Sequence, residues 1–515
     1  MLAKVDEILA SIERLDSGKP RKRITILGAG IASLVAAYEL STRGHRVKVV
    51  EATKRVGGRA HTYKVSDDVY HELGAMRIPT THEFTRHYAL DVCGLTLRRF
   101  VNHHDRQERF YNIRGIVTSH AEAFTRLLPS FRLSEREKRW VTEASTILAL
   151  FTPLGQVTNE VMASPVDLDA LFGRGPMTDR IKELGQLTLG DFLRRNLDTS
   201  EAVDLLGAVT GLEVWWDKAF TMLLRDEIST HGSGGVLHEI VGGTEELPKA
   251  LREMIKDRVE IQYERVVREI HARANAVQIV TSAKDGTDRQ RTDEDFVLCT
   301  IPFSVLRRLE LTGVSIEKQR AIRNLTYASS TKVLLHCAEK FWEAGGVVGG
   351  GSQLDSLVRQ VYYPSAEAQN EPGTKRGLLE GVWAERLDTS IKAGRESKPG
   401  ILVGSYCWDA DARRLGAIPK CDRVRVVADH VSEIHPELRL KGMVLGGESM
   451  FWDENPWAAG AFCFMRPGDF ELYYSDTRKR EGRLYFAGEH CSLDQGWMQG
   501  AIQSSLEAVN EIVSA

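Results

Sequence analysis

A glycine-rich turn near the N-terminus constrains the fold more than any other feature of the sequence. It joins an apolar strand expected at Ile24–Leu27 to an alanine-rich helix at Ile31–Arg43, and a second apolar strand follows at Val47–Val50. A strand, a helix and a further strand in this order make a βαβ unit, in which the two strands lie parallel. The sequence therefore predicts an α/β fold built on a parallel sheet.

The turn has the spacing of a dinucleotide-binding site. Gly28 permits the tight turn, and Gly30 lets the backbone approach a pyrophosphate that the helix N-terminus holds. Ser33 replaces the usual third glycine and is small enough for close helix–strand packing. Glu51 ends the second strand about 20 residues later, where a carboxylate accepts from ribose hydroxyls and repels the 2′-phosphate of NADP. The residues predicted to bind the cofactor here are Gly28, Gly30, Ala32, Ser33, Glu51 and Ala52.

The composition is that of a globular protein with more than one domain. The chain has 515 residues, of which 42% are apolar, and a formal net charge of −3. Neither the charge nor its distribution favours nucleic acid or a membrane as a partner. Seven scattered cysteines without metal-ligand spacing predict no metal site and fit a reducing compartment. The opening residues show helical spacing up to about Gly18 and not the apolar run of a signal peptide, so we expect a cytoplasmic protein.

Strands that belong to one sheet lie far apart in this sequence. Strand patterns recur at Val259–Ile261, Phe296–Cys299 and Arg483–Phe486, and another group begins at Lys332–Leu335. Residues 121–235 instead show apolar residues at the three-to-four spacing of helices. We therefore expect interleaved domains, each assembled from several segments.

Two further motifs identify the dinucleotide. Arg55-Val56-Gly57-Gly58-Arg59 follows Glu51, and Phe486-Ala487-Gly488-Glu489-His490 precedes Gly496-Trp497-Met498-Gln499-Gly500 near the C-terminus. A glycine turn, an acid, a Gly-Gly-Arg loop and this C-terminal pair of motifs together resemble the flavin amine oxidase superfamily. The resemblance extends over residues 236–345 and implies that the cofactor is FAD.

The resemblance also implies the architecture: an α/β fold with an FAD-binding Rossmann-like domain of the glutathione-reductase type, interleaved with a mixed-sheet substrate domain and a helical domain. Residues 21–76, 236–325 and 473–515 are expected to bind FAD, residues 1–20, 77–120 and 326–472 to bind substrate, and residues 121–235 to form the helical domain. The additional cofactor-binding residues that it implies are Gly58, Arg59, Met76, Arg77, Val267, Gly488, Glu489, Gly496, Trp497 and Met498.

Within the superfamily the chain is most similar to L-amino acid oxidases. Gly74-Ala75-Met76-Arg77-Ile78-Pro79 resembles the segment whose arginine binds the substrate α-carboxylate, a task that suits a planar guanidinium. Tyr406 resembles the tyrosine that gives the carboxylate a further hydrogen bond. Phe462 and Trp497, with Gly496 before it, resemble the walls of an aromatic cage.

Lys332 resembles the family lysine that holds a water beside the flavin N5 atom, and it is the predicted catalytic residue. Ala461 stands where monoamine oxidases carry the cysteine that links the flavin, so FAD is expected to bind without a covalent bond. Each of the residues Arg77, Tyr406 and Lys332 could instead have a purely structural role. Arg77 could form a surface ion pair, Tyr406 could be a half-buried strand residue, and Lys332 could be an exposed strand lysine.

Together these residues imply oxidation of an L-amino acid to a 2-keto acid, ammonia and hydrogen peroxide, by hydride transfer from Cα to N5 and with molecular oxygen as the acceptor. A monoamine or polyamine oxidase, an amino-acid monooxygenase or dehydrogenase, and a binding protein without redox chemistry are the alternatives. The cage suits an aromatic or long aliphatic side chain, whereas Asp494 or Glu385 in the pocket would favour arginine or lysine. We also expect a homo-oligomer.

Overall fold

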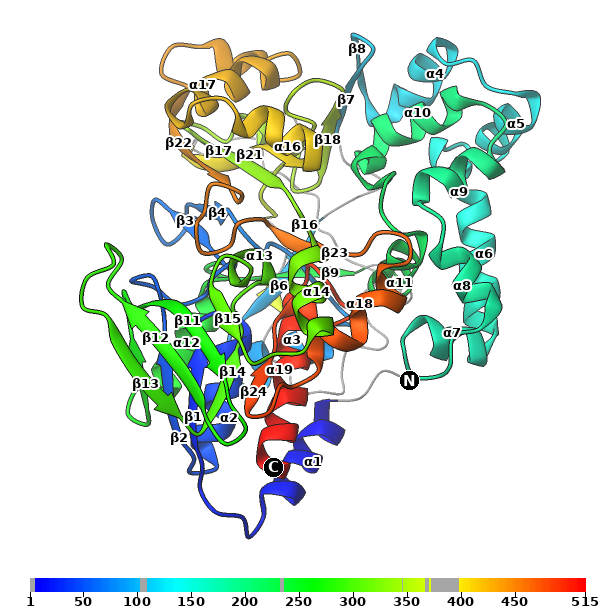
Figure 1. Cartoon of the computed structure of the whole chain (residues 1–515). Helices are drawn as coiled ribbons and strands as arrows, with labels where there is room; N and C mark the ends of the chain where they lie inside the picture. Colours follow the sequence, from blue (N-terminus) through cyan, green and yellow to red (C-terminus); the bar gives the residue numbers. More distant parts are fainter. Residues whose placement is uncertain (1–4, 102–108, 232–235, 345, 366–369, 372–397) are drawn as a thin grey trace.

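The structure is a computed structural model of the chain, and it describes residues 5–101, 109–231, 236–344, 346–365, 370–371 and 398–515. The elements fall into three regions (Figure 1). Both chain ends and the segment from α12 (Glu246–Ile255) to β15 (Glu310–Thr312) form the lower body, a second sheet with two covering helices lies above it, and a column of helices lies to one side.

A five-stranded parallel sheet forms the centre of the lower region. Its order is β10-β2-β1-β14-β24, and every neighbouring pair runs parallel. The strands are β1 (Arg23–Leu27), β2 (Arg46–Val50), β10 (Val259–Gln262), β14 (Phe296–Cys299) and β24 (Leu484–Phe486). Parallel strands covered on both faces are mostly apolar, as in Ile24, Ile26 and Leu27 of β1, which is why these short runs were visible in the sequence.

Helices cover one face of this sheet, and a second sheet covers the other. The helices that share a core with β1 and β2 are α1 (Val5–Asp16), α2 (Ile31–Thr42), α12 (Glu246–Ile255) and α19 (Met498–Ser514). The covering sheet has the order β13-β12-β11-β15, with β11 (Val266–Ala272), β12 (Val277–Ser282), β13 (Gln290–Glu294) and β15 (Glu310–Thr312). This three-layer arrangement confirms the predicted Rossmann-like architecture.

Helix α1 packs within this lower region. Its Val5 and Ile12 are fully buried in the core that α2 and α19 share. Just after α1, the ammonium groups of Lys19 and Lys22 donate to backbone carbonyls at the C-terminal end of α19, at 2.6 Å from Ser514 and Ile512 respectively. The sequence grouped residues 1–20 with the substrate-binding segments, but these contacts place the helix beside the nucleotide-type sheet.

A seven-stranded mixed sheet forms the second region, in the order β22-β17-β21-β19-β18-β7-β8. Its strands are β7 (Phe110–Ile113), β8 (Ile116–Ser119), β17 (Ser330–Cys337), β18 (Gly351–Leu354), β19 (Gln360–Tyr362), β21 (Gly400–Trp408) and β22 (Val444–Phe451). Helices α16 (Asp409–Gly416) and α17 (Lys420–Val431) pack on it and complete its core. The predicted mixed sheet is therefore confirmed.

The third region is helical, as the apolar spacing of residues 121–235 predicted. Its helices are α4 (His120–Leu127), α5 (Glu135–Ala144), α6 (Thr152–Ala163), α7 (Pro165–Leu171), α8 (Asp179–Gly185), α9 (Leu189–Asn196), α10 (Ser200–Thr210) and α11 (Phe220–His231). They enclose a core that also includes Tyr111 and Ile113 of β7. Glu137 fixes the turn before α10, because its carboxylate accepts from the backbone N–H groups of Asp198 and Thr199 at 2.7 and 3.0 Å.

Short elements connect the three regions. The remaining strands are β3 (Thr62–Lys64), β4 (Tyr70–Glu72), β5 (Ile78–Pro79), β6 (Leu97–Phe100), β9 (Leu237–Ile240), β16 (Thr326–Ala328), β20 (Asn370–Glu371) and β23 (Phe462–Phe464). The remaining α-helices are α3 (Glu83–Arg86), α13 (Phe303–Leu306), α14 (Ile316–Asn324), α15 (Phe341–Ala344) and α18 (Asp469–Arg478).

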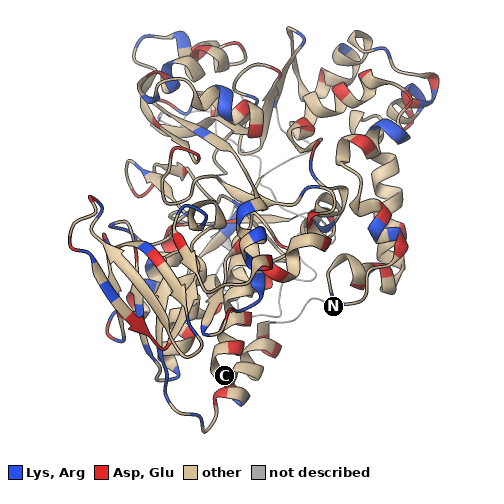
Figure 2. Cartoon of the chain, in the orientation of Figure 1, with Lys and Arg blue, Asp and Glu red and all other residues tan. Residues whose placement is uncertain are grey.

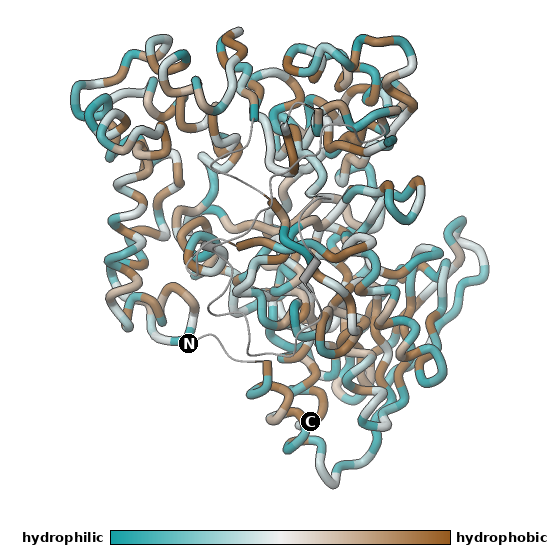
Figure 3. Tube along the Cα trace, turned by 180° about the vertical axis from the view of Figure 1, so that it is seen from behind, coloured by the Kyte–Doolittle hydropathy of each residue, from teal (hydrophilic) through white to brown (hydrophobic). Residues whose placement is uncertain are grey.

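Charge and hydropathy follow this layering. Figure 2 shows basic and acidic residues interspersed along the outer helices and strands. Figure 3 shows hydrophobic segments in the interior strands and helices, with hydrophilic segments at the outer turns. Within the described ranges, no helix combines the length and apolar character that crossing a membrane requires.

Candidate active site

A cavity of about 450 Å³ opens between the parallel sheet and the mixed sheet. At one end it is lined by residues at the carboxyl ends of β1 and β2, where ligands of open α/β sheets bind. At the other end it reaches Lys332 on β17 and Tyr406 on β21, which are opposite each other in the register of the mixed sheet.

The first glycine turn has the shape of a cradle for a diphosphate. Gly28 has a φ of +100°, and a Cβ there would lie 2.9 Å from the Thr300 hydroxyl, so a side chain is excluded by the protein itself. Gly30 is different, because no described atom lies within 4 Å of the position that its Cβ would occupy. The space beside Gly30 belongs to the cavity, and no described side chain caps helix α2, which begins there. An open helix N-terminus with its amides facing a cavity suits a phosphate group.

Glu51 connects the first turn to the segment after β2. Its carboxylate accepts from the backbone N–H of Ala29 at 2.7 Å and from the backbone N–H of Thr53 at 2.8 Å. Ser33 lies on the buried side of α2, where its hydroxyl and that of Thr300 are hydrogen-bonded at 2.6 Å. Glu51 lines the cavity, whereas Ser33 supports helix–strand packing behind it.

The Gly-Gly-Arg loop lies against the first turn. The backbone N–H of Gly57 donates to Ala29 O at 2.8 Å, and a Cβ on Gly58 would lie 3.5 Å from the Cα of Gly30. Arg55 fixes the loop by donating to the carbonyls of Gly58 and Ala60 at 2.5 and 3.2 Å. Two glycine turns therefore meet on one side of the cavity, which is the second feature that fits the diphosphate of FAD.

Arg59 and Glu489 form an ion pair across the cavity wall. Nη1 of Arg59 donates to the Glu489 carboxylate at 2.7 Å and to the carbonyl of Ala461 at 2.9 Å. The carboxylate also accepts from the backbone N–H groups of Cys463 and Gly496, at 3.2 and 3.1 Å. Glu489 thus holds the arginine and the loop before α19 in place, and this is the role that its described contacts support.

Lys332 is buried at the far end of the cavity, with 1% of its surface exposed. Its ammonium donates to the carbonyl of Gly74 at 2.7 Å and lies 4.5 Å from the centroid of the Tyr406 ring. Burial lowers the pKa of Lys332 to about 7, while the negative charge of Glu72 acts in the opposite direction. The alternative of an exposed strand lysine is therefore wrong.

Glu72 is the buried acid that faces this lysine. Burial raises the pKa of its carboxyl to about 7, against hydrogen bonds from Thr244 and the charge of Lys332. The carboxylate accepts from the backbone N–H of Thr244 at 2.7 Å and from the hydroxyl of Thr62 at 2.9 Å. Sequence reasoning missed Glu72, although its place two residues before Gly74 in the quoted motif was a usable signal.

Arg77 and Tyr406 lie together around Tyr362. The guanidinium of Arg77 is 5.6 Å from the centroid of the Tyr362 ring and 5.8 Å from that of Phe100. The rings of Tyr362 and Tyr406 are 6.2 Å apart. Burial raises the pKa of Tyr406, and the positive charge of Arg77 acts against this shift. A cation and a neutral phenol thus lie near each other beside Lys332.

Aromatic side chains form the walls of this end of the cavity. Phe462 and Trp497 both line it, and a Cβ on Gly496 would lie 3.3 Å from the Phe462 ring. Trp215, from the helical region, stacks on Phe462 at 5.9 Å and meets Trp408 edge to face at 5.8 Å. The sequence predicted Phe462 and Trp497, but it missed the two tryptophans because no local motif marks them.

Most predicted site residues line the cavity, including Ala32, Ala52, Gly488, Met498 and Val267. Three predicted cofactor residues, Ser33, Met76 and Arg77, are not among the lining residues. Met76 lies just behind the wall, with its sulfur 3.7 Å from the Lys332 ammonium. Lining residues that the sequence did not indicate include Thr300, Arg308, Trp452, Asn455 and Trp457.

Neither of the two acids that would favour a basic substrate is found among the described residues that line the cavity. Glu385 lies outside the described residues. Asp494 is not among the cavity-lining residues. Burial and the neighbouring charge of Asp226 raise its pKa to about 6, while Arg225 acts in the opposite direction. Asp494 therefore lies in the wall behind Trp497, and it offers no carboxylate to the cavity itself.

The seven cysteines are all free thiols. Cys463 is fully buried on β23, and burial raises its pKa well above the usual value. Ala461, and not Cys463, lines the cavity.

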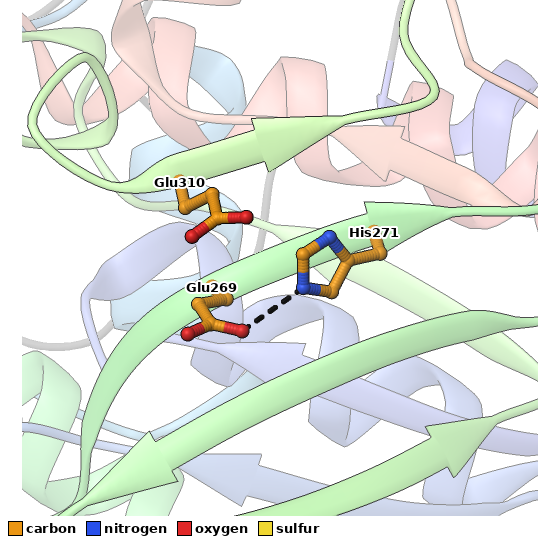
Figure 4. A group of neighbouring side chains, drawn as sticks. All are labelled: Glu269, His271 and Glu310. Atoms are coloured by element: carbon orange, nitrogen blue, oxygen red, sulfur yellow. Dashed lines mark hydrogen bonds and ion pairs between the residues drawn. The ribbon is translucent and has the colours of Figure 1, made fainter.

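One group of possible metal ligands lies outside the cavity. Glu269, His271 and Glu310 come from the adjacent strands β11 and β15, and their ligand atoms lie within 4.8 Å of one another (Figure 4). Glu269 is already paired with His271 at 3.0 Å and with Arg289. An ion here would have to displace these partners, so the geometry assigns no function to the group. Sequence spacing did not reveal it, because Glu310 comes from a separate strand.

Comparison with known proteins agrees with this geometry. The model of the family described as flavin containing amine oxidoreductase matches residues 31–513. The flavin-dependent L-tryptophan oxidase RebO of Lentzea aerocolonigenes is 34% identical over 95% of this chain and 98% of its own length. The putative L-amino-acid oxidase YobN of Bacillus subtilis is 29% identical over 97% of this chain and 96% of its own length.

Solved structures show the same fold at low sequence identity. A putrescine oxidase with bound putrescine superposes with a TM-score of 0.70 at 18% identity, covering 96% of this chain and 100% of its own. A cyclohexylamine oxidase from Brevibacterium oxydans has a TM-score of 0.66, also at 18% identity, covering 96% of this chain and 99% of its own. These similarities support the assignment of the fold.

Proposed function

The chain belongs to the family of flavin-containing amine oxidoreductases, which act on the CH–NH2 group of amino acids or amines, and on this basis we propose that it oxidises L-amino acids. The overall reaction consumes one amino acid, one oxygen and one water, and gives a 2-keto acid, ammonia and hydrogen peroxide. The observation that carries the proposal is the grouping of Arg77 with Tyr406 beside a cavity whose other end fits FAD.

The chain's own residues would hold the flavin without a covalent bond. The two glycine turns and the open N-terminus of α2 suit its diphosphate, and Arg59 lies in the wall beside them. Trp497 and Met498 line the cavity where α19 begins, so the positive end of that helix dipole faces the site. When bound, FAD would supply the acceptor for the two electrons and the Cα hydrogen of the substrate.

Arg77 and Tyr406 would bind the α-carboxylate. A guanidinium offers two parallel N–H donors that match a carboxylate, and a neutral phenol can donate a third hydrogen bond. The raised pKa of Tyr406 keeps its proton available as a donor at neutral pH. Holding the carboxylate at two points fixes the orientation of Cα, and orientation of this kind supplies a large part of an enzymatic rate.

The substrate side chain would lie between aromatic walls. Phe462 and Trp497 offer large apolar surfaces, with Trp215 stacked on Phe462, and an aromatic ring stacks or packs edge to face on such surfaces favourably. The described cavity lining includes no acid other than Glu51 and Glu489, and the contacts of Glu489 are with Arg59 and the backbone. Aromatic and long aliphatic L-amino acids are therefore the substrates that we propose, in line with the L-tryptophan oxidase relative.

The test compares an amino acid with the amine that lacks only its carboxylate. Wild-type protein should release hydrogen peroxide from L-tryptophan with a far higher kcat/KM than from tryptamine. Arg77→Ala removes a charge-assisted contact of about 2–5 kcal/mol, which lowers kcat/KM for L-tryptophan roughly 30- to 4,000-fold. The same change should leave kcat/KM for tryptamine nearly unaltered, and the flavin should stay bound.

Two control variants sharpen the comparison. Arg77→Lys keeps the charge but loses the paired donors, so its kcat/KM should fall between those of the wild type and Arg77→Ala. Arg99→Ala removes an exposed arginine from the neighbouring strand β6 and should change nothing. If tryptamine is the better wild-type substrate, the protein is an amine oxidase and the proposal is wrong. Unchanged amino-acid kinetics in Arg77→Ala would refute the carboxylate role.

A further inference from the structure

The indole of Trp497 is held from the helical region. Its Nε1 donates a hydrogen bond to Oδ1 of Asp226 at 2.7 Å, and Asp226 lies on α11. Trp497 itself comes just before α19, which belongs to the lower region with the parallel sheet. One hydrogen bond therefore joins a helix of the 121–235 segment to a side chain that lines the cavity.

The indole has a second neighbour that limits its movement. His82 packs edge to face on Trp497, with ring centroids 4.9 Å apart and an interplanar angle of 83°. His82 is 3% exposed, and burial lowers its pKa to about 3, so the ring is neutral. The described contact between His82 and the indole is packing, so the described hydrogen bond that orients the indole about its Cβ–Cγ bond is the one to Asp226.

The acceptor is a carboxylate in a confined place. Asp494 lies nearby, and its pKa is raised to about 6 by burial and by the negative charge of Asp226, with Arg225 acting in the opposite direction. Hydrogen bonds to an ionised carboxylate are stronger than bonds between neutral groups. Asp226 offers a carboxylate oxygen to the indole N–H at 2.7 Å.

We propose that Asp226 is a positioning residue that determines specificity: through its bond to the Trp497 indole it sets the shape of the cavity at the substrate side chain. The inference rests on the proposed function, since it takes Trp497 as a wall of the amino-acid site. The helical region thereby takes part in substrate selection without its acid touching the substrate. Loss of the bond frees the indole to turn, which alters the fit of a large ring more than that of a small side chain.

The experiment is a double-mutant cycle on the flavin-loaded protein. The variants are Asp226→Ala, Trp497→Phe and the double variant, with Asp204→Ala, an exposed aspartate of α10, as the matched control. Two quantities are measured: the ratio of kcat/KM for L-tryptophan to that for L-leucine, and the Kd of indole-3-acetate. Indole-3-acetate has the ring and the carboxylate but no amine to oxidise, so its binding is followed by the absorption change of the flavin.

Asp226→Ala should weaken indole-3-acetate binding about tenfold or more and lower the L-tryptophan to L-leucine ratio by a similar factor, mainly through KM. In the Trp497→Phe background, which has no indole N–H, removing Asp226 should have no further effect. Asp226→Asn keeps an acceptor oxygen without the charge and should give an intermediate value. It also replaces the alanine variant in the cycle if that variant does not fold.

Additive effects in the cycle would overturn the inference, as would an equal loss on L-leucine and L-tryptophan, or a change in Asp204→Ala of the same size. Failure of the proposed function gives a different result, because then the wild type releases no hydrogen peroxide from either L-tryptophan or L-leucine. In that case the inference falls with the function on which it rests.

Discussion

Replacing Lys332 by methionine should separate oxygen chemistry from amino-acid chemistry. The change keeps a side chain of similar length and removes the charge and the three donors of the ammonium. Lys332 is buried, donates to the carbonyl of Gly74 and lies over the Tyr406 ring, whereas the proposed ligands of the substrate carboxylate are the Arg77 guanidinium and the Tyr406 hydroxyl. We therefore expect anaerobic flavin reduction by the amino acid to slow only modestly and reoxidation by oxygen to slow far more.

The magnitude follows from the charge state of the lysine. Removing one well-placed electrostatic group from a dry site slows a reaction by about 10²–10³-fold. Because burial lowers the pKa of Lys332 to about 7, the ammonium is charged below that pH and neutral above it. The charged fraction of the lysine therefore falls as the pH rises through about 7. The wild type should therefore reoxidise about 10²-fold faster than Lys332→Met at pH 6, and the advantage should shrink to a few-fold at pH 9.

Stopped-flow absorption measures the two half-reactions separately across this pH range. Glu72→Gln is the matched control, because the negative charge of Glu72 supports protonation of Lys332. Its removal should move the fall in reoxidation rate to lower pH while leaving the lysine in place. If Lys332→Met slows flavin reduction severely and leaves flavin reoxidation unchanged, Lys332 has a role in substrate binding or hydride transfer. If both half-reactions are unchanged, the reasoning is refuted and the lysine has no part in the reaction.

Three further predictions concern the cofactor and stability. Acid precipitation should leave the yellow flavin in the supernatant, since Ala461 lines the cavity and Cys463 does not; colour in the pellet would contradict non-covalent binding. Gly30→Val should fold with an unchanged Tm in the apo form but lose flavin, because its side chain enters cavity space that no described atom occupies; full flavin content would refute the cradle. The free energy of unfolding should decrease below about pH 6.5, by about 1.4 kcal/mol per pH unit for each buried histidine. Burial lowers the pKa values of His82 and His435 in the folded protein to about 3 and 4, so both rings stay neutral there while the same histidines take up protons in the unfolded chain. An equal free energy of unfolding at pH 5 and pH 7, measured by denaturant titration, would refute this.

The fold was predictable where elements that follow one another in the sequence are also neighbours in the structure. The strand at β1, the turn at Gly28 and the helix α2 are contiguous, so the βαβ unit could be read directly from the sequence. The covering helix α1 could not be placed in the same way. Its apolar stripe predicts a helix with one buried face, but only the folded chain shows that the partner is α19, nearly 500 residues later.

The site residues follow the same rule: those in contiguous motifs were predictable, and isolated ones were not. Residues in dense motifs, such as Arg59, Glu489 and Trp497, were found because several neighbours carry the pattern together. Trp215 was missed because it contributes a single side chain that no local motif marks, and Glu72 was missed although it lies two residues before the motif that begins at Gly74.

The helical region illustrates why such residues escape sequence reasoning and still matter. Most of its buried apolar residues belong to a core that also includes Tyr111 and Ile113 of β7, so packing accounts for them. Behind the cavity wall it places one ring, Trp215, which stacks on the lining residue Phe462, and one carboxylate, Asp226, which bonds to the lining residue Trp497. Both lie in the last part of the segment, before β9. The core of this segment lies apart from the core around the glycine turns, so we expect substrate preference to vary through these two positions while the glycine turns and the Arg59–Glu489 pair stay as they are.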